Sequence, residues 1–390
     1  MRALLAEPFW GAHLTDATLF AIAAATLLCC LTWMWLSALR HRARLRAVPV
    51  RIHVAGTRGK STTTRMIAAG LRAGGRKVLA KTTGSEPRLI LPDGTESTWP
   101  RRGPAAVREQ TRLIAKASRL GVDTVVVECM AIRPEFIWAS EKHLVQATTA
   151  VITNTRPDHV EDIGCDADAA AHAARWVVPT NGQLVVAAEA MTPELQTRSD
   201  TRGTVIIVVD TADLAPKAAD RALALAVCAT HGVTADIAGP AMDADNDDPA
   251  NFSERTLNIG GKNVRFANAF ACNDVASLGL LWPQRINVDV VLLNARPDRP
   301  LRTKLFLEFL AARNPTPLLF VVGDPLAMRL ARRAGFHSET LRPLRAREAE
   351  AAMAELAAAT PSGGTILGVG NYHGFGAKLI AAVARQGTPC

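Results

Sequence analysis

The chain has 390 residues, of which 48% are hydrophobic, 5% aromatic and 21% charged, and its formal net charge at pH 7 is +9. This length and composition exclude a disordered or fibrous protein and are typical of an Ala/Val/Leu-rich α/β protein with two domains. The seven cysteines form no CxxC pair and have no histidine at metal-binding spacing, so they indicate neither a zinc site nor a disulfide framework.

The N-terminus carries an apolar segment over residues 17–39. Its roughly 23 residues have no formal charge and suffice, as a helix, to cross about 30 Å of hydrocarbon. Glu7 and Asp16 precede the segment and arginines follow it, so the positive-inside rule puts the N-terminus outside and the rest in the cytoplasm. A cleaved signal peptide has its basic residues before the apolar run, whereas here they follow it. A buried core helix is usually shorter. A single-pass anchor in the cell membrane is therefore favoured.

The arginines that follow the apolar segment supply about half of the net positive charge. They are Arg40, Arg42, Arg44 and Arg46. The remaining charge is ordinary for a protein that handles ATP and acidic substrates, and no basic patch interleaved with aromatic residues is visible. The sequence therefore predicts contact with a membrane and no nucleic-acid partner.

A phosphate-binding loop follows the first apolar strand, residues 51–55, and opens a helix near Ser61. Glycines let successive backbone N–H groups face a phosphate, and the helix N-terminus behind them adds a partial positive charge. Lys60 then reaches the terminal phosphates of ATP, and the Ser61 hydroxyl is placed to ligate Mg²⁺. We assign nucleotide binding to Gly56, Thr57, Arg58, Gly59, Lys60, Ser61 and Thr62.

Beyond this loop, short β-branched runs alternate with amphipathic stretches, which predicts a mainly parallel sheet flanked by helices. The expected strands are 51–55, 77–81, 124–128, 148–153, 183–188 and 204–210. Helices are expected to begin near 61, 104, 134 and 166, and another to run over 214–231. Residues 239–254 are rich in Asp, Asn, Pro and Ala and are predicted to form an exposed loop, since their spacing does not match a calcium loop.

Polar side chains stand at the predicted carboxyl ends of these strands, where ligands of α/β sheets collect. Glu128 directly follows an apolar strand and is predicted to hold Mg²⁺, with an ion pair to an arginine as the alternative. Asn154 ends the next strand, and His159 follows in the loop. His159 is predicted either to bind a second metal or to orient a carboxylate, although a lone histidine is more often structural. Residues 82–84 with Arg88 suit either a carboxylate pocket or a polar turn.

A hairpin over 256–259 and 264–269 and a helix over 273–282 precede a second alternation, which predicts a small Rossmann-like domain. Its strands are expected at 288–293, 318–322 and 365–369, and its helices at 302–313, 325–334, 345–360 and 376–385. Arg296 and Arg302 follow its first strand and are predicted to contact phosphates or, alternatively, to form surface ion pairs. The predicted domains are a membrane anchor over 1–48, an ATP-binding domain over 49–285 and a C-terminal domain over 286–390.

Several segments together resemble the Mur ligase superfamily, whose phosphate loop reads Gly-Thr-x-Gly-Lys-Ser/Thr. A closer similarity is to the ligase subunits of bacterial poly-γ-glutamate synthases (PgsB/CapB). The segments that carry it are 56–61, 81–84, 87–94, 127–131 and 152–159, with islands at 269–274 and 293–299 and in the final Gly-rich turn.

This resemblance implies a P-loop Mur-ligase-like central domain and an ADP-forming amide ligase. ATP is expected to phosphorylate the γ-carboxylate of a polyglutamate chain, and an incoming glutamate then displaces phosphate. Lys60, Glu128 and His159 become the expected catalytic residues, Ser61, Glu128 and His159 the expected metal ligands, and Asn154 a nucleotide contact. Many Mur ligases use a carbamylated lysine, but no lysine lies between Lys142 and Lys217. A second metal would therefore need another carboxylate, such as Glu161 or Asp162, or water as its ligand.

The resemblance also implies small integral-membrane subunits as partners in a capsule or polymer synthase. Two alternatives remain open at this point. One is a Mur-like ligase that adds glutamate or another amino acid to a different carboxylate acceptor. The other is a nucleotide-gated, non-catalytic subunit of a membrane export complex.

Overall fold

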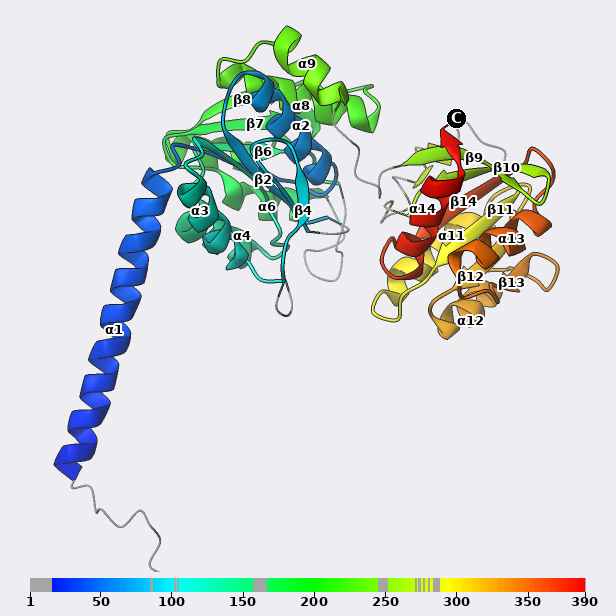
Figure 1. Cartoon of the computed structure of the whole chain (residues 1–390), viewed down its shortest axis with the longest axis horizontal. Coiled ribbons are helices and arrows are strands. Elements are labelled where there is room, and N and C mark those ends of the chain that lie inside the picture. Colours follow the sequence, from blue (N-terminus) through cyan, green and yellow to red (C-terminus); the bar gives the residue numbers. More distant parts are fainter. Residues whose placement is uncertain are drawn as a thin grey trace, which may run out of the picture.

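The computed structural model describes residues 16–84, 87–101, 103, 105–156, 167–244, 252–270, 272, 275, 278–279, 281–282 and 288–389. The chain forms one long N-terminal helix and two α/β units, each built around its own mainly parallel sheet (Figure 1). The predicted fold class is therefore confirmed.

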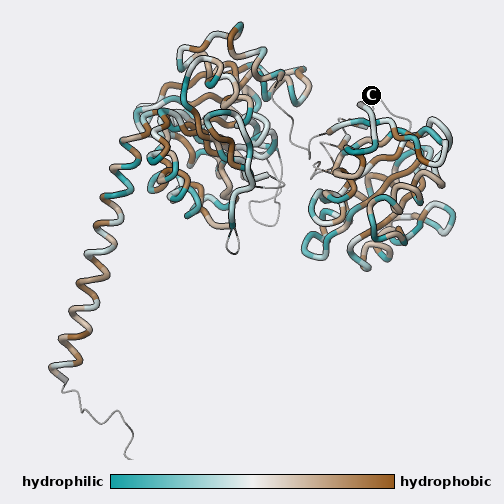
Figure 2. The backbone as a smooth tube through the Cα atoms, viewed as in Figure 1, coloured by the Kyte–Doolittle hydropathy of each residue, from teal (hydrophilic) through white to brown (hydrophobic). Residues whose placement is uncertain are grey.

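The N-terminal helix α1 (Asp16–Arg46) extends away from the central unit as a single rod (Figure 1). It is long and apolar enough to cross a membrane, and its apolar part is not buried by the protein. Figure 2 shows hydrophobic residues along its middle and hydrophilic ones where it meets the central unit. The helix continues beyond the predicted end at residue 39, because Leu45 at its last turn is buried against the central unit.

The central sheet has eight strands in the order β4-β3-β2-β5-β1-β6-β7-β8. Six run parallel, and β3 and β4 add an antiparallel hairpin at one edge. The strands are β1 (Val50–Ala55), β2 (Val78–Thr82), β3 (Arg88–Ile90), β4 (Glu96–Thr98), β5 (Thr124–Glu128), β6 (Thr149–Ile152), β7 (Gln183–Ala187) and β8 (Val205–Val209). Sequence analysis predicted the six parallel strands, whereas β3 and β4 are too short to show a period.

Helices cover both faces of this sheet, since one apolar cluster includes α2 and α8 and another includes α3. The helices are α2 (Lys60–Ala73), α3 (Glu109–Leu120), α4 (Pro134–Ala139), η1 (Ser140–Val145), α6 (Ala167–Ala174), η2 (Arg175–Val177), η3 (Ala188–Ala190), α7 (Pro193–Thr201), α8 (Pro216–Thr230) and α9 (Ala235–Ala244). The predicted loop at 239–254 is wrong over its first part, because α9 buries Ala238 and Met242 against Gly70 of α2. Residues 245–251 lie outside the described part.

The second sheet has the order β13-β12-β11-β14-β10-β9-β15. Its strands are β9 (Ser253–Ile259), β10 (Lys262–Asn268), β11 (Val290–Asn294), β12 (Leu318–Val322), β13 (Leu341–Pro343), β14 (Thr365–Gly370) and β15 (Thr388–Pro389). Its helices are α11 (Pro300–Ala311), α12 (Pro325–Arg333), α13 (Ala349–Ala359) and α14 (Phe375–Gln386). Half of the helix predicted at 273–282 lies outside the described residues, and the residues of this range that are described are helical.

The hairpin β9–β10 belongs to the second sheet, because β10 pairs in parallel with β14. The predicted boundary at residue 285 had assigned this hairpin to the central domain. Its polar, alternating pattern carries no information about which sheet it joins, since that depends on backbone pairing with a strand about 100 residues later. We therefore propose a domain boundary between α9 and β9.

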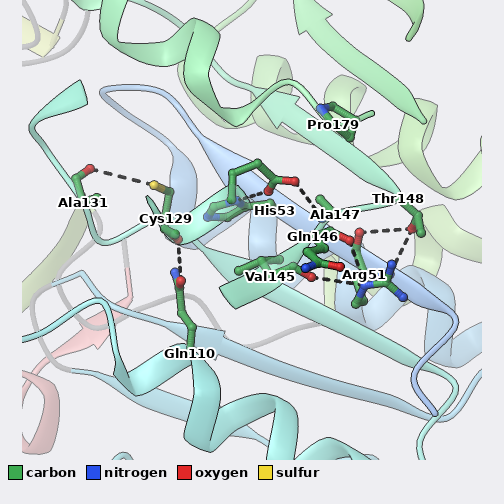
Figure 3. Close-up of polar contacts among 12 residues, drawn as sticks. Arg51, His53, Gln110, Cys129, Ala131, Val145, Gln146, Ala147, Thr148 and Pro179 are labelled. Carbon is green, nitrogen blue, oxygen red and sulfur yellow. Dashed lines mark hydrogen bonds and ion pairs between the residues drawn. The ribbon is translucent and has the colours of Figure 1, made fainter. Parts of the chain in front are cut away.

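A buried ion pair lies under the centre of the first sheet (Figure 3). His53 Nδ1 on β1 is 2.9 Å from Glu141 Oε2 on η1, and both residues are almost fully buried. Burial alone would lower the pKa of His53, but Cys129 and Glu141 raise it to about 10. Only Glu141 stands at hydrogen-bonding geometry, because Nε2 has no hydrogen-bond partner among the described residues. The His53–Glu141 pair thus ties the strand before the phosphate loop to η1.

Candidate active site

The phosphate loop connects β1 to α2 and contains two glycines in the left-handed region, Gly56 (φ 118°) and Gly59 (φ 77°). A Cβ at Gly56 would collide with Thr153 Oγ1, and one at Gly59 would collide with Asp220 Oδ1. Both glycines are therefore required by backbone conformation and by close packing. The strand, loop and helix occur in the order that the sequence predicts.

Lys60 is the first residue of α2, and its side chain folds back over the loop. Its Nζ donates to the carbonyl oxygens of Gly56 at 2.8 Å and Thr57 at 3.1 Å. The N–H groups of the first helical turn, which includes Ser61 and Thr62, have no intrahelical partner. The ammonium group and these N–H groups together form a site for an anion such as a phosphate.

Glu128 ends β5, and parallel pairing places it beside Val54 at the end of β1. Its Oε2 accepts hydrogen bonds from Ser61 Oγ at 2.8 Å and from the Thr83 N–H at 2.6 Å. In the described part of the chain, Oε1 accepts no hydrogen bond. A hydroxyl and a carboxylate oxygen are the hard ligands that Mg²⁺ prefers, so Ser61 and Glu128 fit the predicted metal role. The Thr83 contact was not foreseen, because residues 82–84 also suited a plain turn.

Replacing Glu128 with glutamine should raise the Mg²⁺ concentration required for ATP turnover and lower the maximal rate. Gln keeps the acceptor for Ser61 and Thr83 but removes the charge that attracts the cation. We expect a rate loss of about 10²-fold, the cost of removing one electrostatic contact in an active site. A Mg²⁺ titration of ADP release measures both effects. Glu308→Gln, an exposed control on α11, should change neither; an unchanged Mg²⁺ requirement in Glu128→Gln would contradict the metal role.

Asn154 holds the loop in shape. Its Oδ1 accepts hydrogen bonds from Thr57 Oγ1 at 2.6 Å and from the Arg58 N–H at 3.2 Å. Its Nδ2 donates to the Arg58 carbonyl at 3.1 Å. The side-chain amide is thus engaged with the loop backbone on both sides. Sequence analysis placed Asn154 at the correct strand end, and its direct contact with a nucleotide stays a prediction.

The other predicted site residues lie elsewhere. His159, together with the alternative ligands Glu161 and Asp162, falls outside the described residues. Arg296 pairs with Asp298 within the C-terminal domain, with Nε at 2.8 Å from Oδ1. Arg302 Nη1 donates to Asn371 Oδ1 at 3.2 Å. Both of these hydrogen bonds lie within the C-terminal domain, and the phosphate contacts of the two arginines stay predictions.

In the C-terminal domain, the ends of β11 and β14 form one hydrogen-bonded cluster. Asn294 Nδ2 donates to the carbonyls of Asn371 at 2.6 Å and His373 at 3.0 Å, and Asn371 Nδ2 returns a bond to the Asn294 carbonyl at 3.0 Å. This pairing brings Arg302 beside the Gly-rich turn before α14. Sequence analysis considered the two segments separately, because their proximity follows from strand pairing alone.

Asp220 is a site residue that sequence analysis missed. It lies on α8, is 8% exposed, and packs directly against Gly59 of the phosphate loop. Burial raises the pKa of its carboxyl to about 8, because it outweighs the lowering effects of Thr63 and Arg156. The sequence did indicate that Asp220 lies on the buried face of its helix. It precedes Leu223, Ala224 and Val227 by three, four and seven residues and so shares their apolar face.

Asp220→Asn should stabilise the central domain at pH 8. The native carboxyl keeps a proton that the unfolded chain releases near pH 4, so the free energy of unfolding of the wild type falls as pH rises from 4 to 8. The neutral amide avoids this loss, which is on the order of a few kcal/mol at pH 8 and near zero at pH 4. Thermal unfolding at both pH values measures it. Asp213→Asn, at an exposed left-handed position that asparagine tolerates, is the control, and a destabilised Asp220→Asn at pH 8 would refute the assignment.

Comparisons with known proteins match both units of the chain. Residues 54–222 match the family described as the Mur ligase middle domain, and residues 254–386 match the poly-gamma-glutamate synthase CapB C-terminal domain. The chain is 27% identical over 364 residues to the Bacillus subtilis (strain 168) protein called PGA synthase CapB, covering 88% of this chain and 92% of that protein. It is 28% identical over 306 residues to the Capsule biosynthesis protein CapB of Bacillus anthracis, covering 74% and 66% respectively.

The fold also occurs in a solved structure of a bifunctional folylpolyglutamate synthase/dihydrofolate synthase with Mn, AMPPNP and L-glutamate bound. The two chains superpose with a TM-score of 0.64 over 89% of this chain and 92% of that one, at 17% sequence identity. At this identity the likeness establishes the shared fold, and the binding residues have to be argued from the geometry above.

Proposed function

Because the chain belongs to the Mur ligase superfamily and is an ATP-dependent amide ligase, we propose that it polymerises glutamate into poly-γ-glutamate. The observation that carries this proposal is the convergence of Lys60, Ser61 and Glu128 on one phosphate loop. The match of its second unit to the poly-gamma-glutamate synthase CapB C-terminal domain supports this polymer as the product. The curated relatives named PGA synthase CapB and Capsule biosynthesis protein CapB support the same choice.

The reaction has two steps in this proposal. An oxygen of the γ-carboxylate at the chain end attacks the γ-phosphorus of ATP, and ADP leaves. The amine of an incoming glutamate then attacks the acyl carbon, loses a proton, and phosphate leaves as the amide forms. Lys60 and the N–H groups at the start of α2 bind the phosphate oxygens and offset the charge that builds on them.

Ser61 and Glu128 would hold a Mg²⁺ ion, which neutralises phosphate charge when bound. Thr83 and Asn154 are positioning residues. Thr83 orients the Glu128 carboxylate, and Asn154 maintains the conformation of the phosphate loop. Arg296 and Arg302 are proposed to complete the nucleotide site from the C-terminal domain, and His159 to bind a second metal. Each of these assignments follows the chemistry of the side chain at its strand end.

The proposed placement is in the cell membrane, with α1 as a single span. The arginines after the apolar segment favour the cytoplasmic side for both α/β units, where ATP is present. A polyanionic product needs a route across the membrane that one helix does not provide, so small integral-membrane subunits are proposed as partners.

The test is ATP turnover by the full chain in detergent with Mg²⁺, with and without glutamate, followed by mass analysis of products. We expect glutamate-dependent release of ADP and phosphate and a ladder spaced by glutamyl residues. ADP release that depends on another amino acid or acceptor would assign a different Mur-type ligation. Folded protein that binds ATP and forms neither product, even with its membrane partners present, would refute the ligase and favour a nucleotide-gated subunit.

A further inference from the structure

The end of α1 is fastened to the central domain at several points. Leu45 and Val48 are 3% and 0% exposed and belong to an apolar cluster that includes Leu113 of α3. His41 Nε2 forms a hydrogen bond with the Leu144 carbonyl at 3.0 Å. These contacts fix the position of the central domain along the axis of α1, relative to the apolar segment of that helix.

The Arg51 guanidinium contacts both sides of this junction, and Figure 3 shows its hydrogen bonds on the side of η1. Its Nη1 donates to the carbonyl of Leu45 in the last turn of α1 at 3.1 Å, and to those of Val48 and Pro49 after the helix at 2.7 and 3.4 Å. Its Nε donates to the carbonyls of Val145 at 3.1 Å and Gln146 at 2.8 Å, which end η1. In the described part of the chain no hydrogen bond uses Nη2. Arg51 is therefore oriented by the backbone and keeps one N–H pair for another acceptor.

A pocket of about 210 Å³ opens beside this guanidinium, and three of its five lining residues are arginines. Arg42, Arg46 and Arg51 line it together with Leu45 and Gln146, and none of the five is acidic. Arg42 and Arg46 are one helical turn apart and exposed, and neither has an ion-pair or hydrogen-bond partner among the described residues. Three guanidinium groups around one cavity, without a carboxylate, favour an anion with several oxygen atoms.

The height of the pocket relative to the bilayer follows from helix geometry. The apolar segment ends at Leu39, so at 1.5 Å per residue Arg42 lies about 4.5 Å and Arg46 about 10 Å beyond it along the axis. The headgroup layer is roughly 5–8 Å thick on each side of the hydrocarbon core. When α1 spans the membrane, the Arg42 side of the pocket would therefore lie at the level of the lipid phosphates, and the Arg46 side just beyond them toward the domain.

We propose that this arginine pocket, formed by Arg42, Arg46 and Arg51, binds the phosphodiester headgroup of an anionic phospholipid. The ligand would bridge the last turns of α1 and the domain, and so couple the anchor to the ligase unit. The proposal rests on the membrane span proposed above and is independent of the ligase reaction. Basic residues are also attracted to any negatively charged membrane surface, without a pocket. The experiment below separates this general attraction from the binding of one lipid in the arginine pocket.

The chain offers a matched pair of variants. Arg42→Gln/Arg46→Gln removes two arginines that line the pocket, whereas Arg40→Gln/Arg44→Gln removes the same charge from neighbouring positions that do not line it. Arg51 is left intact, because its loss would leave five backbone carbonyls at the junction without its hydrogen bonds. Equal thermal unfolding midpoints of both variants and the wild type establish that the junction stays folded.

The measurement is native mass spectrometry of the full chain in detergent, titrated with short-chain phosphatidylglycerol or phosphatidylcholine. We expect one phosphatidylglycerol to bind to the wild type and to Arg40→Gln/Arg44→Gln, and roughly 30-fold weaker binding to Arg42→Gln/Arg46→Gln, at about 1 kcal/mol per arginine. Equal losses in both variants, or equal binding of the two lipids, would overturn the proposal. Displacement by millimolar inorganic phosphate would also overturn it, because the site would then serve the free anion.

Discussion

Lys60→Ala should reduce glutamate-dependent ADP release by at least about 10³-fold. In the folded protein Nζ lies over the loop, bonded to the Gly56 and Thr57 carbonyls. A terminal phosphate of ATP would take the place of these weak neutral acceptors, and the ammonium then offsets charge as the phosphoryl group transfers. Electrostatic contacts of this kind at a phosphoryl-transfer site account for losses of 10³-fold or more when removed. A coupled ADP assay on the full chain in detergent measures the loss.

Two further variants make the Lys60 result specific. Lys304→Ala removes an exposed lysine on α11 whose recorded ion pair is with Glu308, and it should keep wild-type turnover. Lys60→Arg keeps the positive charge but changes the shape of the donor, so it should recover only part of the rate. Turnover of Lys60→Ala within tenfold of the wild type would place the nucleotide phosphates away from this loop.

Glu141→Gln should destabilise the central domain strongly below pH 7 and weakly near pH 10. The native pKa of His53 is about 10, above the value of 6.5 expected for the unfolded chain. The stabilising effect of the pair is therefore fully present below pH 6.5 and is lost as pH rises through 10. Removing the charge of Glu141 should cost about 3–5 kcal/mol at pH 6, the range for breaking a buried ion pair.

Glutamine keeps the shape of Glu141 and an acceptor for the Ala147 N–H, which is bonded at 2.8 Å. Without the Glu141 charge the pKa of His53 falls, because one of the groups that raise it is lost, so near pH 10 the variant and the wild type should unfold at similar temperatures. At pH 6 the midpoint should fall by roughly 10 °C, given 2–4 °C per kcal/mol for a domain of this size. Glu135→Gln, an exposed neutralisation on α4, is the control; a Glu141→Gln midpoint that is equally low at both pH values would contradict the ion pair.

Much of the candidate site was predictable because it is local or follows from strand direction. The phosphate loop is one contiguous hexapeptide, and its order between strand and helix was correct. Glu128 and Asn154 were placed beside it because the carboxyl ends of neighbouring parallel strands meet at one edge. The hydrogen bonds from Ser61 and Thr57 to these two residues connect the predicted strand ends to the loop.

Other parts of the site depend on contacts between distant segments. Asp220 reaches Gly59 only because α8 packs against α2, and the apolar run around Asp220 is compatible with many packing arrangements. The cluster of Asn294, Asn371 and Arg302 likewise requires that β14 pair with β11. The predicted boundary at residue 285 placed the hairpin β9–β10 in the central domain for the same reason, although the hairpin joins the second sheet.

By itself, the sequence determined the apolar span, the phosphate loop, the two α/β alternations and the residues at their strand ends. These features are periodic or contiguous, so neighbouring residues specify them through backbone geometry and side-chain period. Only the tertiary structure decided which sheet the hairpin joins and that Asp220 borders the loop. It also decided that Arg51 lines one pocket with Arg42 and Arg46 at the end of α1. Those outcomes depend on packing and hydrogen bonds between segments far apart in the chain, and no local pattern encodes them.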